Sequence, residues 1–334
     1  MRAMILSAQA PMAERPLAPR VMTLREPGAG EVLVAVTACA ICRTDLHIIE
    51  GDLPLTRAPL ILGHQVVGRV LHGGAGADRL ITGTRVGIAW LRSTCGTCAF
   101  CVSGRENLCV HARFTGYHDD GGYAEYAVAP DAFVYPLPPV FDDAEAAPLL
   151  CAGIIGYRAL KIAAVPPGGV LGMYGFGSSA HITLQIAIAR GCTVYVCTRE
   201  PKHRELALSL GAAWAGDTPA RMPTPADGII VFAPAGELVP RALQNLAAGG
   251  TVALAGIHMS AIPAIPYDDL YRERAIRSVT ANTRTDGTEF LAEAARLPVR
   301  PTITRFALED ANDALGRLKE GRLTGTGVLI PTGV

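Results

Sequence analysis

The sequence predicts an α/β protein with two domains, an irregular β domain and a doubly wound domain built on a parallel sheet. Three observations lead to this expectation. Residues 1 to about 150 are rich in glycine, proline and short alternating runs, which are typical of strands between turns. After Cys151, strand patterns alternate with helical patterns, as in a parallel sheet covered by helices. A glycine-rich turn directly follows the first strand of this second half.

The first half contains short expected strands and few helical patterns before Ala144. Its clearest strands are Met1–Leu6, Glu31–Val36 and Val66–Leu71. The N-terminal apolar run is too short before Pro11 to be a signal peptide. No apolar run approaches the roughly 20 residues that a membrane helix needs. We therefore expect a soluble, cytoplasmic protein with no membrane partner.

The second half is a series of strands and helices. In chain order, the pattern predicts strand Val170–Tyr174, helix Ala180–Ala189, strand Thr193–Thr198, helix Lys202–Leu210, strand Gly228–Phe232, helix Leu238–Leu246 and strand Thr251–Ala255. The tail returns to mixed structure. Its helix is expected at Leu308–Lys319 and its last strand at Gly327–Ile330.

The composition narrows the possible classes of function. The 334 residues include 30 Lys and Arg against 30 Asp and Glu, so the formal net charge is zero, and there is no basic run. A nucleic-acid-binding protein usually has a basic stripe, so no nucleic-acid partner is expected. The nine cysteines are clustered and no secretory signal precedes them, which favours metal ligands over disulfides.

A dinucleotide-binding motif opens the predicted second domain. Residues 175–180, Gly-Phe-Gly-Ser-Ser-Ala, match GxGxxA after a strand and at the start of a helix. Gly175 permits the tight turn, Gly177 lets the backbone approach a pyrophosphate, and Ala180 keeps helix and strand close. At the helix start, Ser178 lies among the N–H groups that bind phosphates. We also expect Gly256 and Ile257, after strand Thr251–Ala255, to contact the cofactor.

The end of the second predicted strand bears on the choice of cofactor. NAD-binding proteins of this kind carry an acidic residue there, which binds the ribose hydroxyls. This chain has Thr198 and Arg199 instead, which suit a 2′-phosphate and favour NADP(H). The alternative is that Arg199 is only solvated and Glu200 reaches the ribose, in which case NAD(H) binds.

Four cysteines predict a closed metal site within a lobe at about residues 90–112. Cys95, Cys98, Cys101 and Cys109 have the spacing CxxCxxCx7C. Four thiolates in a short segment can surround one tetrahedral zinc and leave no open position, so this zinc is expected to be structural. An iron–sulfur cluster or free thiols are the alternatives.

A second, dispersed group consists of Cys42, His64 and Cys151. Taken singly, such residues are more often inert core cysteines or a satisfied histidine. Their contexts change this interpretation. Gly63-His64, the four-cysteine lobe, the run Gly-Gly-Tyr-Ala-Glu-Tyr at 121–126 and the GxGxxA turn occur in one order along nearly the whole chain. In these motifs the chain resembles the zinc-dependent alcohol dehydrogenases of the medium-chain dehydrogenase/reductase family.

The resemblance implies roles for these residues. Cys42, His64 and Cys151 would bind a catalytic zinc, with the alcohol oxygen in the fourth position. Thr44 and His47 match the family's proton relay; alternatively, they are a helix N-terminal hydroxyl and a surface histidine.

Further roles follow from the same resemblance. Asp45 matches the carboxylate that orients a ligand histidine, and Arg43 matches a basic residue on the pyrophosphate. An apolar substrate pocket would be lined by Ile48, Leu53, Trp90 and Tyr117; core packing is the alternative for Trp90.

The chain departs from the family pattern at several positions. Gln65 stands where a glutamate usually follows the ligand histidine. Ile154 and Ile155 fill the region where a threonine often packs beside the nicotinamide. The usual arginine near the C-terminus is missing from residues 324–327. These changes affect kinetic details and cofactor contacts more than the class of reaction.

The resemblance also implies the overall organisation. We expect a GroES-like catalytic domain at 1–152 and 283–334 and a Rossmann cofactor domain at 153–282. Two zincs per subunit, NADP(H) or NAD(H), a small alcohol or aldehyde substrate and a homodimer or homotetramer complete the expectation. Two other classes stay open: a zinc-free quinone or enoyl reductase of the same superfamily, and a non-catalytic zinc- and nucleotide-binding protein.

Overall fold

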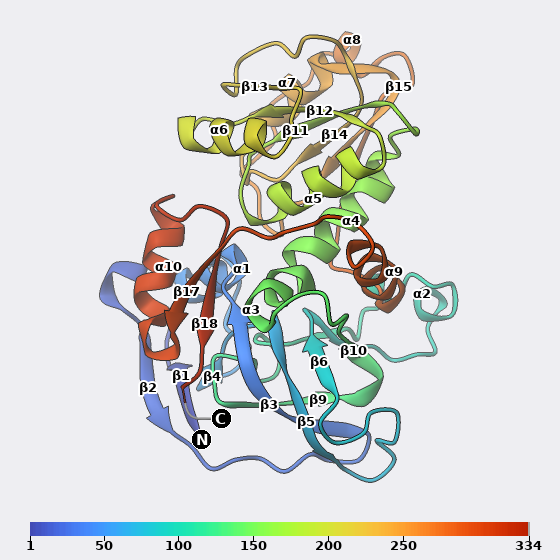
Figure 1. Cartoon of the computed structure of the whole chain (residues 1–334). Coiled ribbons are helices and arrows are strands. Elements are labelled where there is room, and N and C mark those ends of the chain that lie inside the picture. Colours follow the sequence, from blue (N-terminus) through green and yellow to red (C-terminus); the bar gives the residue numbers. More distant parts are fainter. Residues whose placement is uncertain (333–334) are drawn as a thin grey trace. The chain divides into compact units, whose positions relative to one another are not determined.

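The computed structural model describes residues 1–332, and their contacts divide the chain into two compact units (Figure 1). The first unit comprises Met1–Cys151, Ala281–Ala292 and the described residues from Pro301 onward. The second comprises Ala152–Thr280 and Glu293–Arg300. The expected division assigned 283–334 to the catalytic domain in one piece, whereas the contacts place Glu293–Arg300 with the second unit.

The first unit is built around strand β3 (Glu31–Ala40), which is buried along most of its length. β3 pairs with three strands in a seven-stranded sheet, whose order is β10-β6-β5-β3-β18-β17 with β9 paired to β3. The other strands of this sheet are β5 (Val66–Gly73), β6 (Arg85–Ile88), β9 (Tyr126–Pro130), β10 (Val134–Pro136), β17 (Ile303–Ala307) and β18 (Thr326–Ile330).

Two smaller sheets complete this unit. One has the order β2-β1-β4, and the other pairs β7 with β8 on either side of the four-cysteine segment. Their strands are β1 (Arg2–Leu6), β2 (Leu17–Val21), β4 (Leu60–Ile61), β7 (Leu91–Ser93) and β8 (Arg113–Phe114). The predicted β character of this half is therefore present, and the last two strands of the described residues, β17 and β18, return to its main sheet.

Helix α1 (Arg43–Glu50) was expected only in the alternative interpretation that makes Thr44 a helix N-terminal hydroxyl. Its buried face includes Thr44 and Asp45, and these polar residues hide the apolar periodicity. The other helices with residues in this unit are α2 (Ala99–Val102), α3 (Asp143–Ala146), α9 (Arg284–Ala294) and α10 (Ala311–Lys319).

The second unit contains a six-stranded parallel sheet with the order β13-β12-β11-β14-β15-β16. In chain order within the unit this is 3-2-1-4-5-6, the strand order of the Rossmann fold, and the expected α/β fold class is confirmed. The strands are β11 (Val170–Tyr174), β12 (Thr193–Cys197), β13 (Trp214–Gly216), β14 (Ala226–Val231), β15 (Leu246–Leu254) and β16 (Ala275–Ser278).

The helices of this unit are α4 (Ala152–Ala163), α5 (Ser178–Ala189), α6 (Pro201–Ser209), α7 (Leu238–Gln244) and α8 (Tyr267–Leu270). Helix α4 was not expected, since two glycines interrupt its apolar pattern. One of them, Gly156, has a packing reason: a Cβ there would lie 1.9 Å from the Thr183 hydroxyl of α5. Helix α7 ends before Leu246 because that residue pairs with Ala226 as part of β15.

No single helix in residues 1–332 is long and apolar enough to cross a membrane. Only the bent pair 143–150 and 152–163 reaches that length and apolarity together, and most of its residues are buried.

Candidate active site

The four cysteines of the lobe lie together as the spacing predicts. The Sγ atoms are separated by 3.8 Å for Cys95 and Cys101, 3.5 Å for Cys98 and Cys101, and 3.6 Å for Cys95 and Cys109. Four thiolates about 2.3 Å from one zinc would be about 3.8 Å apart. The group therefore fits a tetrahedral ion closely.

An ion pair fastens this lobe to helix α9. The Arg284 guanidinium donates to both carboxylate oxygens of Glu106, with Nη2 2.7 Å from Oε2 and Nε 3.1 Å from Oε1. The Arg284 backbone N–H donates to the same carboxylate at 2.8 Å. The guanidinium also lies over the Phe133 ring, 4.4 Å from its centroid. Glu106 lies between two of the lobe cysteines, so this contact holds the metal-binding segment directly.

The second group brings together three distant parts of the first unit. Cys42 is the N-cap of α1, His64 lies between β4 and β5, and Cys151 ends the 3-10 turn Ala147–Leu150. The ligand atoms of these three residues lie within 4.8 Å of one another. His64 is fully buried, and neither of its ring nitrogens has a hydrogen-bond partner among the described residues. A buried imidazole left unsatisfied beside two thiols fits a metal ligand.

The two thiols of this group influence each other. A hydrogen bond from Cys151 lowers the pKa of Cys42 well below its usual value. One thiolate is thus favoured even before a metal binds. A bound ion would complete the deprotonation, because the thiolate is the ligand form.

Asp45 links two of the three candidate ligands. One carboxylate oxygen, Oδ2, accepts a hydrogen bond from the Cys42 backbone N–H at 2.8 Å. The other, Oδ1, lies 3.4 Å from His64 Nδ1, without the alignment of a hydrogen bond. This leaves Nε2 as the nitrogen for a metal, and the carboxylate lies where the family resemblance expects it.

The hydroxyl of Tyr123 is a contact that the sequence reasoning missed. It donates to Asp45 Oδ2 at 2.8 Å, and both side chains are fully buried. Burial and the Asp45 charge raise the pKa of Tyr123 well above its usual value, so the phenol stays a donor. Tyr123 belongs to the motif at 121–126, but nothing in that motif indicates a partner 78 positions away.

Gln65 is also buried, and it contacts the backbone before Cys42. Its Nε2 lies 3.2 Å from each of the carbonyl oxygens of Ala40 and Ile41, to which it donates. A glutamate, the usual residue of the family at this position, is unable to donate both bonds as a carboxylate.

The expected relay residues lie on α1. The Thr44 hydroxyl is 3.6 Å from Cys42 Sγ, and Thr44 is buried. His47 is partly exposed, and its Nδ1 lies 2.8 Å from Asp52 Oδ2, a partner that was not anticipated. Arg43 is exposed at the first position of the helix.

An aromatic wall adjoins the His64 ring. Trp90 meets His64 edge to face, with ring centroids 4.8 Å apart, and it stacks on Phe114 at 4.9 Å and on Tyr117 at 6.0 Å. Phe114 was not among the expected pocket residues. Of the other two expected pocket residues, Ile48 is fully buried in the core and Leu53 packs against that core from a partly buried position.

The expected cofactor residues gather at the carboxyl edge of the parallel sheet in the second unit. Gly175, at the end of β11, has a φ of +86°, which favours glycine. Gly177 is the N-cap of α5, Ser178 is its first residue, and Ala180 is fully buried. Gly256 and the half-exposed Ile257 follow β15. Ligands of such sheets bind outside this edge.

The loop after β12 is shaped by an arginine. Thr198 is buried and Arg199 is exposed. Arg204 of α6 donates from Nη1 to the carbonyl oxygens of Thr198, at 2.7 Å, and Arg199, at 2.8 Å. These two bonds connect the start of α6 directly to the loop after β12.

The fold and the two groups of candidate metal ligands together indicate a class, the two-domain zinc-binding dehydrogenases. Residues 28–139 match the family model of the alcohol dehydrogenase GroES-like domain, and residues 180–296 match that of the zinc-binding dehydrogenases. The chain belongs to the zinc-dependent alcohol dehydrogenases of the medium-chain dehydrogenase/reductase family.

Comparison with individual proteins supports the same family. The chain is 50% identical over 326 residues to the probable alcohol dehydrogenase AdhA of Mycobacterium tuberculosis (strain CDC 1551 / Oshkosh), covering 96% of this chain and 94% of that protein. Two solved structures are similar throughout. Acetophenone reductase from Geotrichum candidum in complex with NAD has a TM-score of 0.89 at 25% identity, over 98% of this chain and 96% of that one. A Sinorhizobium meliloti 1021 protein described as a zinc-binding dehydrogenase, bound to NADP, has a TM-score of 0.86 at 27% identity, over 99% of both chains.

Proposed function

We propose that this protein oxidises small alcohols, and reduces the corresponding carbonyl compounds, at a zinc held by Cys42, His64 and Cys151. The observation that carries the proposal is the buried, unsatisfied imidazole beside two thiols. Three protein ligands leave a fourth position for substrate, whereas the four-cysteine lobe has no open position. Two zincs per subunit follow, one catalytic and one structural.

The residues around the centre fit this reaction. A zinc held by these three residues would supply a Lewis acid for the alcohol oxygen, and a bound nicotinamide cofactor would supply the hydride acceptor. The Thr44 hydroxyl, beside Cys42, would take up the alcohol proton as it gives up its own, and His47, whose Nδ1 contacts Asp52, would carry a proton outward. Asp45 keeps the His64 ring oriented, and the Trp90 wall keeps water from the reacting atoms.

Two measurements test this function. Metal analysis of the purified protein should find two zincs per chain. An alcohol-dependent absorbance change of the nicotinamide should appear with a panel of primary and secondary alcohols. A fully active protein with one metal or none contradicts the proposal. The thiols that both centres need fit a reducing, cytoplasmic location.

The aromatic wall favours primary aliphatic or aromatic alcohols. Trp90 is held between His64 and the ring of Phe114, so the wall is fixed close to the proposed metal ligand. Trp90→Ala should enlarge the space and improve kcat/KM for bulky secondary alcohols relative to primary ones. An unchanged ratio places Trp90 outside the pocket.

The cofactor proposed is NADP(H). Arg199 is exposed at the end of β12, on a loop that Arg204 fixes through two carbonyl groups. A charge-assisted bond from Arg199 to a 2′-phosphate, about 1.5–3 kcal/mol, favours NADP(H) by about one to two orders of magnitude.

Matched variants test this choice. Arg199→Ala should raise KM for NADP⁺ by at least about tenfold with little change for NAD⁺. Glu200→Gln is the control and should leave NADP⁺ binding unchanged. Equal effects of Arg199→Ala on both cofactors, or a wild type that prefers NAD⁺, contradict the proposal.

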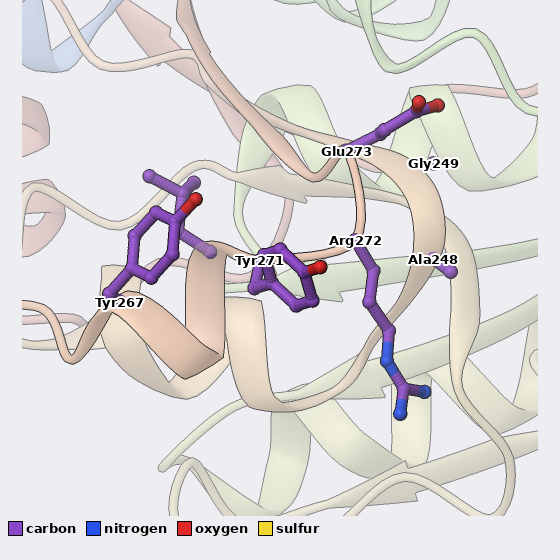
Figure 2. A pocket seen from close by; sticks show the side chains of 7 residues that line it. Ala248, Gly249, Tyr267, Tyr271, Arg272 and Glu273 are labelled. Atoms are coloured by element: carbon purple, nitrogen blue, oxygen red, sulfur yellow. The ribbon is translucent and has the colours of Figure 1, made fainter.

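We propose a homo-oligomer assembled through the β16 edge of the second unit. No strand in the described part of the chain pairs with the outer edge of β16. Large exposed apolar side chains gather in the segment before this strand: Ile257, Ile262, Tyr267 and Tyr271. Figure 2 shows Tyr267 and Tyr271 at an open pocket that Arg272 and Glu273 also line.

An unpaired edge beside apolar surface suits a second copy, and a two-fold axis would pair the two edges. Sedimentation should show a dimer or tetramer at micromolar concentration. In a double variant, Tyr267→Ser with Tyr271→Ser, the equilibrium between oligomer and monomer should shift toward the monomer. A wild type that sediments only as a monomer overturns this proposal.

A further inference from the structure

The segment Gly121–Tyr123 is bonded to the residues that lead into His64. The backbone N–H groups of residues 121, 122 and 123 donate to the carbonyl oxygens of Ile61, Gly63 and Leu62, at 2.7, 2.9 and 2.9 Å. His64 follows immediately. Three consecutive hydrogen bonds therefore hold the backbone just before a proposed metal ligand.

The glycines of this region allow the close approach. A Cβ at Gly121 would lie 2.0 Å from the Gly63 oxygen. Gly63 has a φ of +93°, and a Cβ there would lie 2.4 Å from the Tyr123 ring. The ring thus packs against the backbone next to His64, in space that a side chain at Gly63 would fill.

The end of the same ring reaches the carboxylate that serves the ligands. The Tyr123 hydroxyl donates to Asp45 Oδ2 at 2.8 Å, the same oxygen that accepts the Cys42 N–H. The other Asp45 oxygen faces His64. Without the Tyr123 hydroxyl, the contacts of the fully buried Asp45 carboxylate recorded among the described residues would be those with the Cys42 N–H and with His64.

We propose that Tyr123 is a positioning residue of the catalytic metal centre. Its ring packs against the backbone before His64, and its hydroxyl fixes the Asp45 carboxylate that contacts Cys42 and His64. The hydroxyl therefore determines how firmly this centre retains its zinc. The inference rests on the proposed zinc site and adds a residue that the relay and the ligand set do not include.

The two zincs of one chain provide the test. Zinc release from the loaded protein is followed with a chromogenic chelator, and the two phases are assigned with Cys42→Ser and Cys98→Ser. Tyr123→Phe keeps the ring and removes the hydroxyl. Outer partners of metal ligands typically change metal affinity by 10–100-fold, and we expect the catalytic zinc to leave about tenfold faster. The lobe zinc should leave at the wild-type rate.

Two further variants make the result specific. Tyr126→Phe removes a hydroxyl three residues further along and should release both zincs as the wild type does. Asp45→Asn should accelerate catalytic zinc release, and adding Tyr123→Phe to it should have little further effect, because the contact is already weakened. With Co²⁺ in the catalytic site, Tyr123→Phe should shift the visible absorption bands.

Three outcomes overturn the inference. They are a Tyr123→Phe release rate within about twofold of the wild type, equal acceleration of both phases, and additive effects of the two substitutions. Failure of the zinc site itself is recognised separately, because the wild type would then release zinc in one phase only.

Discussion

The two candidate metal centres of this chain are encoded in different ways. The lobe cysteines lie between residues 95 and 109, on one short segment, and three of them are partly exposed. The second centre takes its ligands from residues 42, 64 and 151, and its His64, Asp45 and Tyr123 are fully buried. The first can gather around an ion by local folding alone. The second exists only after the main sheet of the first unit has formed.

The support around each centre differs accordingly. The lobe depends on its own backbone and on the Glu106–Arg284 ion pair. The buried centre is surrounded by fixed donors, from Tyr123 and from Gln65, that hold the backbone and carboxylate beside the ligands. We infer that the lobe zinc stabilises structure, whereas around the catalytic centre the structure positions the metal. Substitutions at the two centres should separate these effects.

Cys42→Ser should have the largest effect on turnover. Loss of a thiolate ligand removes the Lewis acid, whose contribution of several kcal/mol corresponds to about a thousandfold or more in kcat. Metal analysis should find one zinc, held by the lobe, and the melting temperature should change little. A variant that keeps more than about a tenth of the activity would show that Cys42 is no ligand.

Cys98→Ser should affect stability first. Structural zinc contributes folding free energy directly, so we expect the melting temperature to fall by roughly 10 °C. At low temperature the variant should keep most of its turnover. Scanning calorimetry measures the melting temperature, metal analysis measures the zinc content, and the alcohol-dependent absorbance change of the nicotinamide measures the turnover. Loss of turnover with unchanged stability would mean that the two centres have been assigned the wrong way round.

The difference between ligands on one short segment and ligands far apart in the chain also explains what the sequence could predict. The four lobe cysteines have a diagnostic spacing, and the GxGxxA turn at 175–180 has a local context, so both followed from residue order alone. Cys42, His64 and Cys151 were grouped only through the family resemblance, because their spacing carries no local signal. The Tyr123–Asp45 contact joins residues 78 positions apart, and no pattern indicates it.

Missed elements have similar causes. Helix α1 has a weak apolar pattern because its buried face carries the polar residues Thr44 and Asp45. Helix α4 was overlooked because Gly156 suggests a helix breaker. Only the packing against Thr183 shows why the residue is small. The strands β11, β12 and β14, by contrast, were predictable because each is a short apolar run that is buried along nearly its whole length.

Gln65→Glu tests whether the two hydrogen bonds from the Gln65 amide hold the backbone beside the buried centre. A carboxylate would face the carbonyl oxygens of Ala40 and Ile41 without a proton to donate, and leaving such buried groups unsatisfied costs about 2 kcal/mol. The melting temperature should therefore fall by roughly 4–8 °C at neutral pH. Burial raises the pKa of the introduced carboxyl, so the deficit should grow as pH rises above about 4.3.

Gln65→Leu separates the causes, since it removes both hydrogen bonds without adding a charge. Its deficit should be independent of pH. A Gln65→Glu protein as stable as the wild type would show that the amide contacts do not hold the backbone before Cys42.

The smallest effect is expected at the lobe anchor. Burial alone would raise the pKa of Glu106, but hydrogen bonds from Arg284 outweigh it and hold the pKa below the ordinary 4.5. A carboxyl with a lowered folded pKa stabilises the protein fully above its unfolded value and loses that contribution as pH falls through the folded one. Glu106→Gln should therefore lower stability by about 1 kcal/mol above pH 4.5, since solvent screens the partly exposed Arg284.

Below that pH the difference from the wild type should narrow, because the wild-type carboxyl is then protonated as well. Glu293→Gln is the matched control: Glu293 pairs with Arg190 at 2.7 Å near the other end of α9 and belongs to the second unit. Denaturant unfolding at pH 4 and pH 7 measures the stability of both variants, and the chelator assay measures zinc release. Only Glu106→Gln should speed loss of the lobe zinc, because only its carboxylate lies on the metal-binding segment. If both variants release that zinc equally fast, α9 as a whole, and not this ion pair, stabilises the lobe.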